Sequence, residues 1–134
     1  MKLDDAIAMA EKSPKKILLS VTAEWCGYCK KMDREVYGQQ VVADLIDEHF
    51  YPAYIDTDSK NEVNFMGETY TEQELAWAFR ITGTPTTIFL SAEGKPLGVQ
   101  PGFIPGDVFK KLVSFVGTDS FKSMSFDEYE PSSK

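Results

Sequence analysis

The chain has 134 residues, a hydrophobic fraction of 43% and a formal net charge of −7. That length suits one domain, and that apolar content builds a core without disulfide staples. The acidic balance argues against nucleic acid as a partner, and no apolar run approaches the roughly 18 residues that span a bilayer.

The first half of the chain alternates helical and strand patterns. Leu3–Lys12 carries apolar residues at helical spacing, and Ser13-Pro14 ends the helix. Residues 16–22 are a nearly continuous apolar run, which is typical of a strand buried on both faces. Helices are predicted from Cys26 to about Tyr37 and from 41 to 49, with a break at Gly38.

The second half begins with a strand at 51–55 and a polar segment at 57–70, which we expect to be an irregular surface excursion. A capping box of Thr71 and Glu74 opens a helix that ends near Arg80. Two strands and a final helix follow, at 86–90, 97–99 and 105–116. Trp77 is expected in the core, and the last helix is expected to bury Val108, Phe109, Leu112, Val113 and Val116.

This order predicts an α/β fold with a central mixed sheet and helices on both of its faces. We expect one domain over 1–134, with its core at about 16–116 and an acidic tail at 117–134. Within that tail, four apolar residues are candidates for fastening it to the domain: Phe121, Met124, Phe126 and Tyr129.

The only two cysteines, Cys26 and Cys29, lie three positions apart between a strand and a helix. A disulfide closing so small a ring constrains the unfolded chain little, so stapling is a poor reason for the pair. At a helix N-terminus the pKa of the Cys26 thiol is lowered, and thiolate is the attacking species in disulfide exchange. Cys29, one turn further and expected to be less exposed, is placed to resolve a mixed disulfide.

Two other interpretations of the pair stay open. Half of a zinc site would need about two further ligands, for which the chain offers one histidine, His49, and scattered carboxylates. Inert core cysteines at helical spacing are the second possibility. The position at a helix start and the flanking tryptophan and glycine favour redox chemistry.

Three segments together resemble the thioredoxin superfamily. Residues 17–30, Ile-Leu-Leu-Ser-Val-Thr-Ala-Glu-Trp-Cys-Gly-Tyr-Cys-Lys, are similar to its active-site segment, and Thr84-Pro85-Thr86 is similar to its cis-proline turn. Gly102 resembles the glycine that closes its substrate groove. The resemblance covers about 16–116 and implies a four- or five-stranded sheet, with Cys26 as nucleophile and Cys29 as resolving thiol.

The same resemblance implies roles for the residues around the cysteines. Thr84 and a cis Pro85 would hold an extended substrate chain through backbone contacts, beside Gly102. Trp25 would pack beside the active site, and Tyr28, between the cysteines, would be exposed and able to contact substrate. The resemblance implies neither a cofactor nor a metal.

Within the superfamily, the chain most resembles periplasmic thioredoxin-like proteins such as those attached to sulfur oxidation. Its Cys-Gly-Tyr-Cys motif also matches that of the bacterial periplasmic disulfide isomerase. The N-terminus has no apolar stretch typical of a signal peptide. We therefore expect a periplasmic or otherwise exported protein whose leader has been removed, with a cytosolic location as the alternative.

Two positions depart from the family pattern. Ser20 stands where thioredoxin has a buried aspartate, and Pro52 stands where it has the partnering lysine. Removing both charges avoids leaving one buried and unpaired. Glu24 is then the nearest carboxylate in sequence to the cysteines, and it is either a proton-transfer group acting through water or a solvated acid at a helix start.

Together these features predict a monomeric thiol–disulfide oxidoreductase that acts on disulfide-bearing protein substrates and is recycled by a redox partner protein. Reduction or isomerisation is expected rather than oxidation. The alternative is a client-binding or scaffold protein that uses the cis-proline groove without redox turnover.

Overall fold

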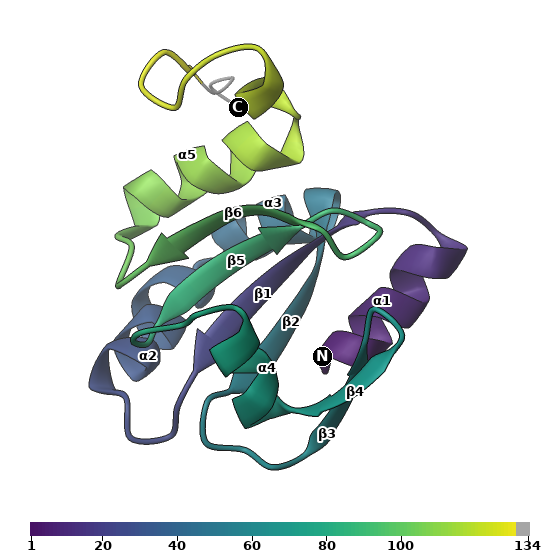
Figure 1. Cartoon of the computed structure of the whole chain (residues 1–134). Helices are drawn as coiled ribbons and strands as arrows, with labels where there is room; N and C mark the ends of the chain where they lie inside the picture. Colours follow the sequence, from purple (N-terminus) through teal and green to yellow (C-terminus); the bar gives the residue numbers. More distant parts are fainter. Residues whose placement is uncertain (131–134) are drawn as a thin grey trace.

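The structure is a computed structural model that describes residues 1–130 (Figure 1). Its helices are α1 (Leu3–Lys12), α2 (Gly27–Met32), the π-helix η1 (Asp33–Tyr37), α3 (Gln40–His49), α4 (Glu72–Ala78), α5 (Gly106–Gly117) and the short 3₁₀ turn η2 (Ser120–Lys122). Its strands are β1 (Lys16–Thr22), β2 (Phe50–Asp56), β3 (Glu62–Phe65), β4 (Glu68–Thr71), β5 (Thr86–Leu90) and β6 (Pro96–Pro101).

Four strands form the mixed sheet that the order of elements predicted, and the structure gives their order as β2-β1-β5-β6. β1 and β2 are parallel, whereas β5 runs antiparallel to both of its neighbours. Both edge strands carry proline: Pro52 lies inside β2, and Pro96 and Pro101 bound β6. Edge strands tolerate proline because one side of them has no ladder hydrogen bond to lose.

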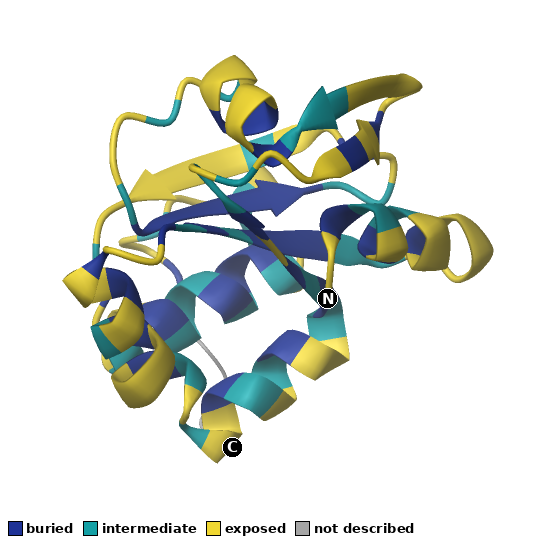
Figure 2. Ribbon diagram, turned by 90° about the horizontal axis from the view of Figure 1, so that it is seen from below, coloured by how far each residue is buried: buried dark blue, intermediate teal, exposed yellow. Residues whose placement is uncertain are grey.

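Helices cover both faces of this sheet (Figures 1 and 2). α1, α4 and the β3–β4 hairpin pack on one face, over strand residues such as Leu19 and Ile88. α2, η1, α3 and α5 pack on the other face, over Leu18 and Phe89. The central strands β1 and β5 are mostly buried, whereas the edge strand β6 is mostly exposed (Figure 2). The alternation of strand side chains divides most of the core into two clusters, one on each face of the sheet.

The irregular excursion expected at 57–70 is a correction, because most of it is the β3–β4 hairpin. Val63 and Phe65 are buried in the core, and the Phe65 ring meets Phe79 edge-on with centroids 5.5 Å apart. Met66 and Gly67 both have positive φ, as a two-residue hairpin turn requires. In β3 only Val63 and Phe65 alternate with polar residues, so the alternation was too short to predict a strand.

Two residues expected in the core lie at the surface instead. Trp77 is 84% exposed, because α4 directs Leu75 and Ala76 to the core and turns the next position outward. Val108 is 45% exposed for the same reason, since the buried stripe of α5 begins one residue later, at Phe109. The capping box of Thr71 and Glu74 is present as predicted.

The expected helix over 26–37 changes character at Asp33, where α2 continues as the π-helix η1. This wider turn ends at Gly38, where an added Cβ would lie 2.6 Å from the Arg34 carbonyl oxygen. Tyr37, the last residue of η1, packs edge-on against Phe109 of α5 with ring centroids 5.3 Å apart. The π-helix therefore fixes where Tyr37 enters the core.

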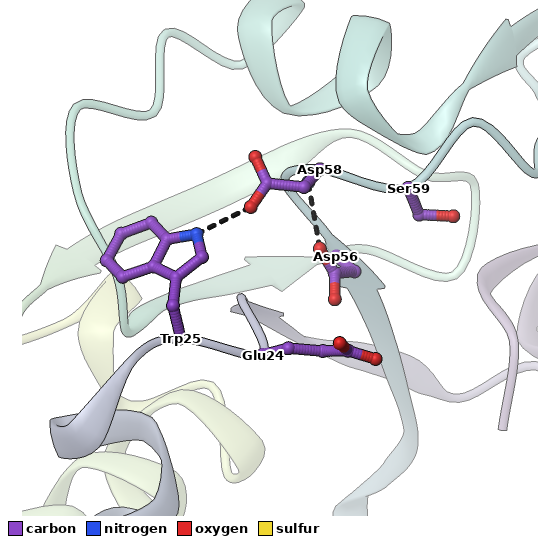
Figure 3. A pocket seen from close by; sticks show the side chains of 5 residues that line it. All are labelled: Glu24, Trp25, Asp56, Asp58 and Ser59. Atoms are coloured by element: carbon purple, nitrogen blue, oxygen red, sulfur yellow. Dashed lines mark hydrogen bonds between the residues drawn. The ribbon is translucent and has the colours of Figure 1, made fainter.

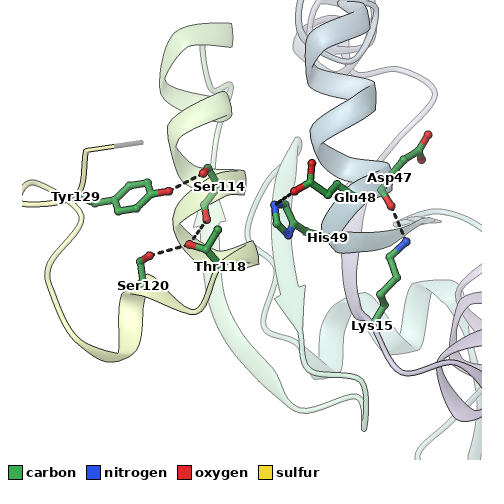
Figure 4. A network of polar contacts seen from close by, with 8 residues as sticks. All are labelled: Lys15, Asp47, Glu48, His49, Ser114, Thr118, Ser120 and Tyr129. Carbon is green, nitrogen blue, oxygen red and sulfur yellow. Dashed lines mark hydrogen bonds and ion pairs between the residues drawn. The ribbon is translucent and has the colours of Figure 1, made fainter. Parts of the chain in front are cut away.

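The C-terminal segment is fastened to α5 (Figure 4). The Tyr129 hydroxyl lies 2.6 Å from the Ser114 hydroxyl, and the Phe126 and Tyr129 rings pack on Phe115. Phe121 also reaches Phe115, whereas Met124 is exposed. Residues 131–134 of the predicted tail lie outside the described residues.

The C-terminal end of α3 lies across from α5 and carries the single histidine (Figure 4). His49 Nε2 lies 3.2 Å from Glu48, and Lys15 donates to the Asp47 carbonyl. The Lys15 ammonium, near the C-terminal end of α3, complements the helix dipole. Among the described residues, no helix is long and apolar enough to cross a membrane.

Candidate active site

The two cysteines form a disulfide where β1 passes into α2, with their Cα atoms 5.3 Å apart. The Cys26 N–H donates to the Ala23 carbonyl, and this turn brings the chain from the buried strand into the helix. Cys26 is the N-cap of α2, and its Sγ accepts a hydrogen bond of 3.1 Å from the Cys29 N–H. The two sulfurs are bonded to each other.

Both cysteines are buried in this oxidised form, Cys26 at 4% and Cys29 at 5% exposure. The expectation that Cys29 is the less exposed of the two is therefore not met. What distinguishes the sulfurs is their position: Cys26 Sγ faces a backbone N–H at the helix start, and Cys29 lies one turn inside the helix. A donor aimed at a sulfur favours its thiolate form.

The Thr84–Pro85 peptide bond is cis, as predicted. The Gly102 N–H donates to the Pro85 carbonyl at 2.8 Å, and Gly102 has a φ of +90, which explains the glycine at this position. The structure thus joins two of the predicted substrate-binding positions directly. The Thr84 hydroxyl is buried and finds no hydrogen-bond partner among residues 1–130.

Tyr28 connects the cysteine motif to this turn. Its side chain is 63% exposed, as predicted, and its ring lies 6.3 Å from that of Phe103, the residue after Gly102. Lys31 Nζ lies 4.9 Å from the Phe103 ring centroid. Sequence reasoning missed Phe103 and Lys31; the position of Phe103 beside the predicted groove glycine was the available signal.

Trp25 lies on the other flank of the motif and is 70% exposed. Its Nε1 donates to Asp58 Oδ2 at 2.5 Å, so the indole is held by a hydrogen bond at the rim (Figure 3). Glu24, Asp56 and Ser59 complete the lining of this pocket of about 620 Å³. Asp58, which follows the end of β2, was not among the predicted site residues.

Glu24 therefore lies together with Asp56 and Asp58 on the Trp25 side of the motif (Figure 3). Ser20 and Pro52 line a different pocket, between β1–β2 and the helices that follow the cysteines. The structure thus separates Glu24 from the positions where the resemblance places the family's buried charges.

Comparison with known proteins agrees with this geometry. Residues 3–117 match the family model described as a thioredoxin-like domain. The disulfide bond reductase DsbH of Chlamydia pneumoniae is 29% identical over 103 residues, which are 76% of this chain and 61% of that protein. A protein disulfide-isomerase of Hordeum vulgare is 30% identical over 91 residues, which are 68% of this chain and 15% of that protein.

The chain thus spans about three fifths of the reductase and a much smaller part of the isomerase. Among solved structures, a thioredoxin-fold protein from Helicobacter pylori superimposes with a TM-score of 0.77 at 24% identity, covering 85% of this chain and 76% of that one. None of these matches carries features specific to sulfur oxidation, so that narrower expectation gains no support. The chain belongs to the thioredoxin-like domain family, and it carries a CxxC pair, Cys26 and Cys29, whose sulfurs form a disulfide.

Proposed function

We propose that this domain exchanges disulfides with protein substrates as a reductant or isomerase. The reduced Cys26 thiolate attacks a substrate disulfide and forms a mixed disulfide, and one substrate sulfur leaves as a thiol. Cys29 then attacks Cys26 Sγ, which closes the intramolecular disulfide and releases the second substrate thiol. A partner protein with a dithiol returns the pair to its reduced form.

The observation that carries this proposal is the position of the disulfide. Cys26 caps α2 and accepts the Cys29 N–H, so the helix start supports a thiolate at Cys26. The turn of Thr84, Pro85 and Gly102 offers backbone groups that we propose hold an extended substrate, with Tyr28 and Trp25 as rim contacts. The names of the matched reductase and isomerase support a reducing or isomerising role.

We also propose that the domain works in an exported compartment, since its active-site segment resembles that of exported thioredoxin-like proteins. A periplasm or similar space is where disulfides persist and need correction. The redox potential of the Cys26–Cys29 couple against glutathione determines the direction of exchange. A potential near that of thioredoxin would support a reductant, and one near that of protein disulfide isomerase would support an isomerase.

The test is reduction of insulin disulfides by the protein with dithiothreitol, comparing wild type with Cys26→Ser and Cys29→Ser. We expect both variants to lose turnover, and only Cys29→Ser to accumulate a stable mixed disulfide visible by mass spectrometry. Alkylation against pH should show Cys26 reacting with a pKa below the free-thiol value of about 8.5. If Cys26→Ser keeps binding a client while wild type shows no turnover, the scaffold alternative is correct.

A further inference from the structure

A pocket of about 320 Å³ lies between the β1–β2 side of the sheet and the helical segment that follows the cysteines. Ser20, Pro52 and Tyr54 line it from the strands, and Asp33 and Tyr37 line it from η1. Asp33 is the one carboxyl group among the residues that line this pocket.

Asp33 lies one helical turn after Cys29, because its N–H donates to the Cys29 carbonyl. Side chains four residues apart share a helix face, and Cα–Cβ bonds tilt toward the helix N-terminus. The Asp33 carboxyl therefore extends back toward the turn that carries Cys29. Glu24, in contrast, lines the pocket beside Trp25.

The surroundings of Asp33 suit a proton acceptor. Asp33 is exposed as a whole residue, but partial desolvation of its carboxyl beside the pocket raises the pKa of that carboxyl above its usual value, closer to that of a thiol. The titratable groups that share the pocket are Tyr37, Tyr54 and the Met1 nitrogen, which donates to the Pro52 carbonyl at 3.2 Å. Burial is the largest cause of the raised pKa of Tyr37, and the negative charge of Asp33 also raises it. The two groups therefore interact electrostatically.

The inner end of this region is polar. Tyr37 Oη is shielded from solvent and has no protein partner of normal hydrogen-bond geometry within residues 1–130. The hydroxyls of Ser20 and Thr87 face it and partly offset the effect of burial on its pKa. Ser20 and Thr87 are paired in register on β1 and β5. A pocket of this volume, lined by several polar groups, meets the requirements for bound water.

Resolution of a mixed disulfide needs such an acceptor, because Cys29 attacks as a thiolate and is only 5% exposed in the oxidised form. We propose that Asp33, acting through water in this pocket, accepts the proton that the Cys29 thiol loses when it resolves the mixed disulfide. This inference rests on the proposed exchange function.

The step balances as follows for substrate reduction. The Cys29 proton passes through water to the Asp33 carboxylate, and the Cys29 sulfur bonds to Cys26 Sγ. The bond between Cys26 and the substrate sulfur breaks, and its electron pair leaves with that sulfur, which takes a proton from solvent. The cysteine pair is oxidised by two electrons and the substrate disulfide is reduced by two.

The experiment is a stopped-flow reaction of the reduced protein with the aromatic disulfide DTNB. Attack by Cys26 releases the first coloured thiolate, and resolution by Cys29 releases the second. We expect Asp33→Asn to slow the second phase about tenfold at pH 7 and leave the first unchanged. Asp33→Glu, which keeps the carboxyl, should restore much of the rate and its dependence on pH.

Glu35→Gln is the matched control, since Glu35 is an acid of η1 that is exposed like Asp33, lies beside Arg34 and does not line this pocket. It should leave both phases at the wild-type rate. An unchanged second phase in Asp33→Asn overturns the proposal, as does slowing in Glu24→Gln alone. The proposal is also overturned if Asp33→Asn and Asp33→Glu slow the second phase equally and leave its dependence on pH unaltered. That result would mean that Asp33 has a structural role.

A measurement on the wild-type protein covers the case in which Asp33→Asn fails to fold. The carboxyl pKa of Asp33, followed by NMR, should differ between the oxidised and reduced proteins, and equal titration in both states refutes the coupling. The proposed function fails separately, if the wild-type protein shows no second phase and no insulin reduction. Two wild-type phases with no effect of Asp33→Asn would remove only this inference.

Discussion

Truncating Phe65 tests whether the β3–β4 hairpin belongs to the core. The Phe65 side chain is 8% exposed, and its ring packs edge-on against Phe79 with centroids 5.5 Å apart. Phe65→Ala would remove about 120 Å² of buried apolar surface, given the 150–250 Å² that an aromatic side chain buries. At about 25 cal/mol per Å² this is about 3 kcal/mol. Loss of the ring pair adds about 1 kcal/mol.

We therefore expect Phe65→Ala to lower the free energy of unfolding by about 3–4 kcal/mol, in the usual range for Phe→Ala in a core. Urea unfolding of the oxidised protein measures this, because the Cys26–Cys29 disulfide then stays the same in every variant. Glu62→Ala, an exposed position on the same strand, is the control and should change stability by less than about 0.5 kcal/mol. A loss below about 1 kcal/mol for Phe65→Ala would refute the placement of the hairpin in the core.

Three further predictions concern local features. Gly38→Ala should lower the free energy of unfolding in urea by about 1–3 kcal/mol, because the new Cβ would lie 2.6 Å from the Arg34 carbonyl oxygen. A variant as stable as wild type would contradict this close approach. Thr71→Ala should cost about 1 kcal/mol, since it removes the cap of α4, and thermal unfolding with no shift would show that the capping box is dispensable. Lys16 lowers the pKa of Asp119 through a 2.8 Å contact, so the folded state binds its proton less readily than the unfolded chain. At pH 7 the free energy of unfolding of the wild-type protein should therefore exceed that of Asp119→Asn, by less than about 1 kcal/mol because the site is half-exposed. This difference should disappear in acid, where the folded carboxyl becomes protonated. A difference that grew in acid would contradict the lowered pKa.

Much of the fold followed from patterns that depend on sequence alone. The α1 helix begins and ends at the predicted residues, and the buried run of 16–22 is strand β1. Apolar periodicity and the helix-ending Ser13-Pro14 pair act over a few neighbouring residues, so their effect does not depend on how the rest of the chain packs. The cis peptide bond before Pro85 followed from the family resemblance, since sequence periodicity carries no sign of it.

The errors arose where tertiary packing selects among local options. Trp77 is apolar and helical, yet α4 is short and only one of its sides meets the sheet, so its neighbours fill the core. The β3–β4 hairpin forms a sheet of its own, whose buried face depends on α1 and α4 rather than on its own pattern.

At the candidate site, the cysteines and the turn at Pro85 could be assigned from motifs, whereas the residues around them could not. Phe103 and Asp58 join the site through contacts with Tyr28 and Trp25 that bridge segments far apart in sequence. Asp33 lies only four residues after Cys29, but the pocket that it lines also needs Ser20 and Pro52 from the strands. No pattern within the helix shows that these strand residues lie beside it.

The prolines of the edge strands have a consequence for how copies of the domain behave together. Pro52 interrupts the donors of β2, and Pro96 and Pro101 leave a short run between them in β6. Strands from other molecules add to a sheet only where an edge presents a continuous row of donors and acceptors. Within residues 1–130, both edges of the four-stranded sheet are interrupted in this way, so the sheet is a poor template for fibril-like growth. The domain can therefore reach high concentrations without polymerising through its own sheet.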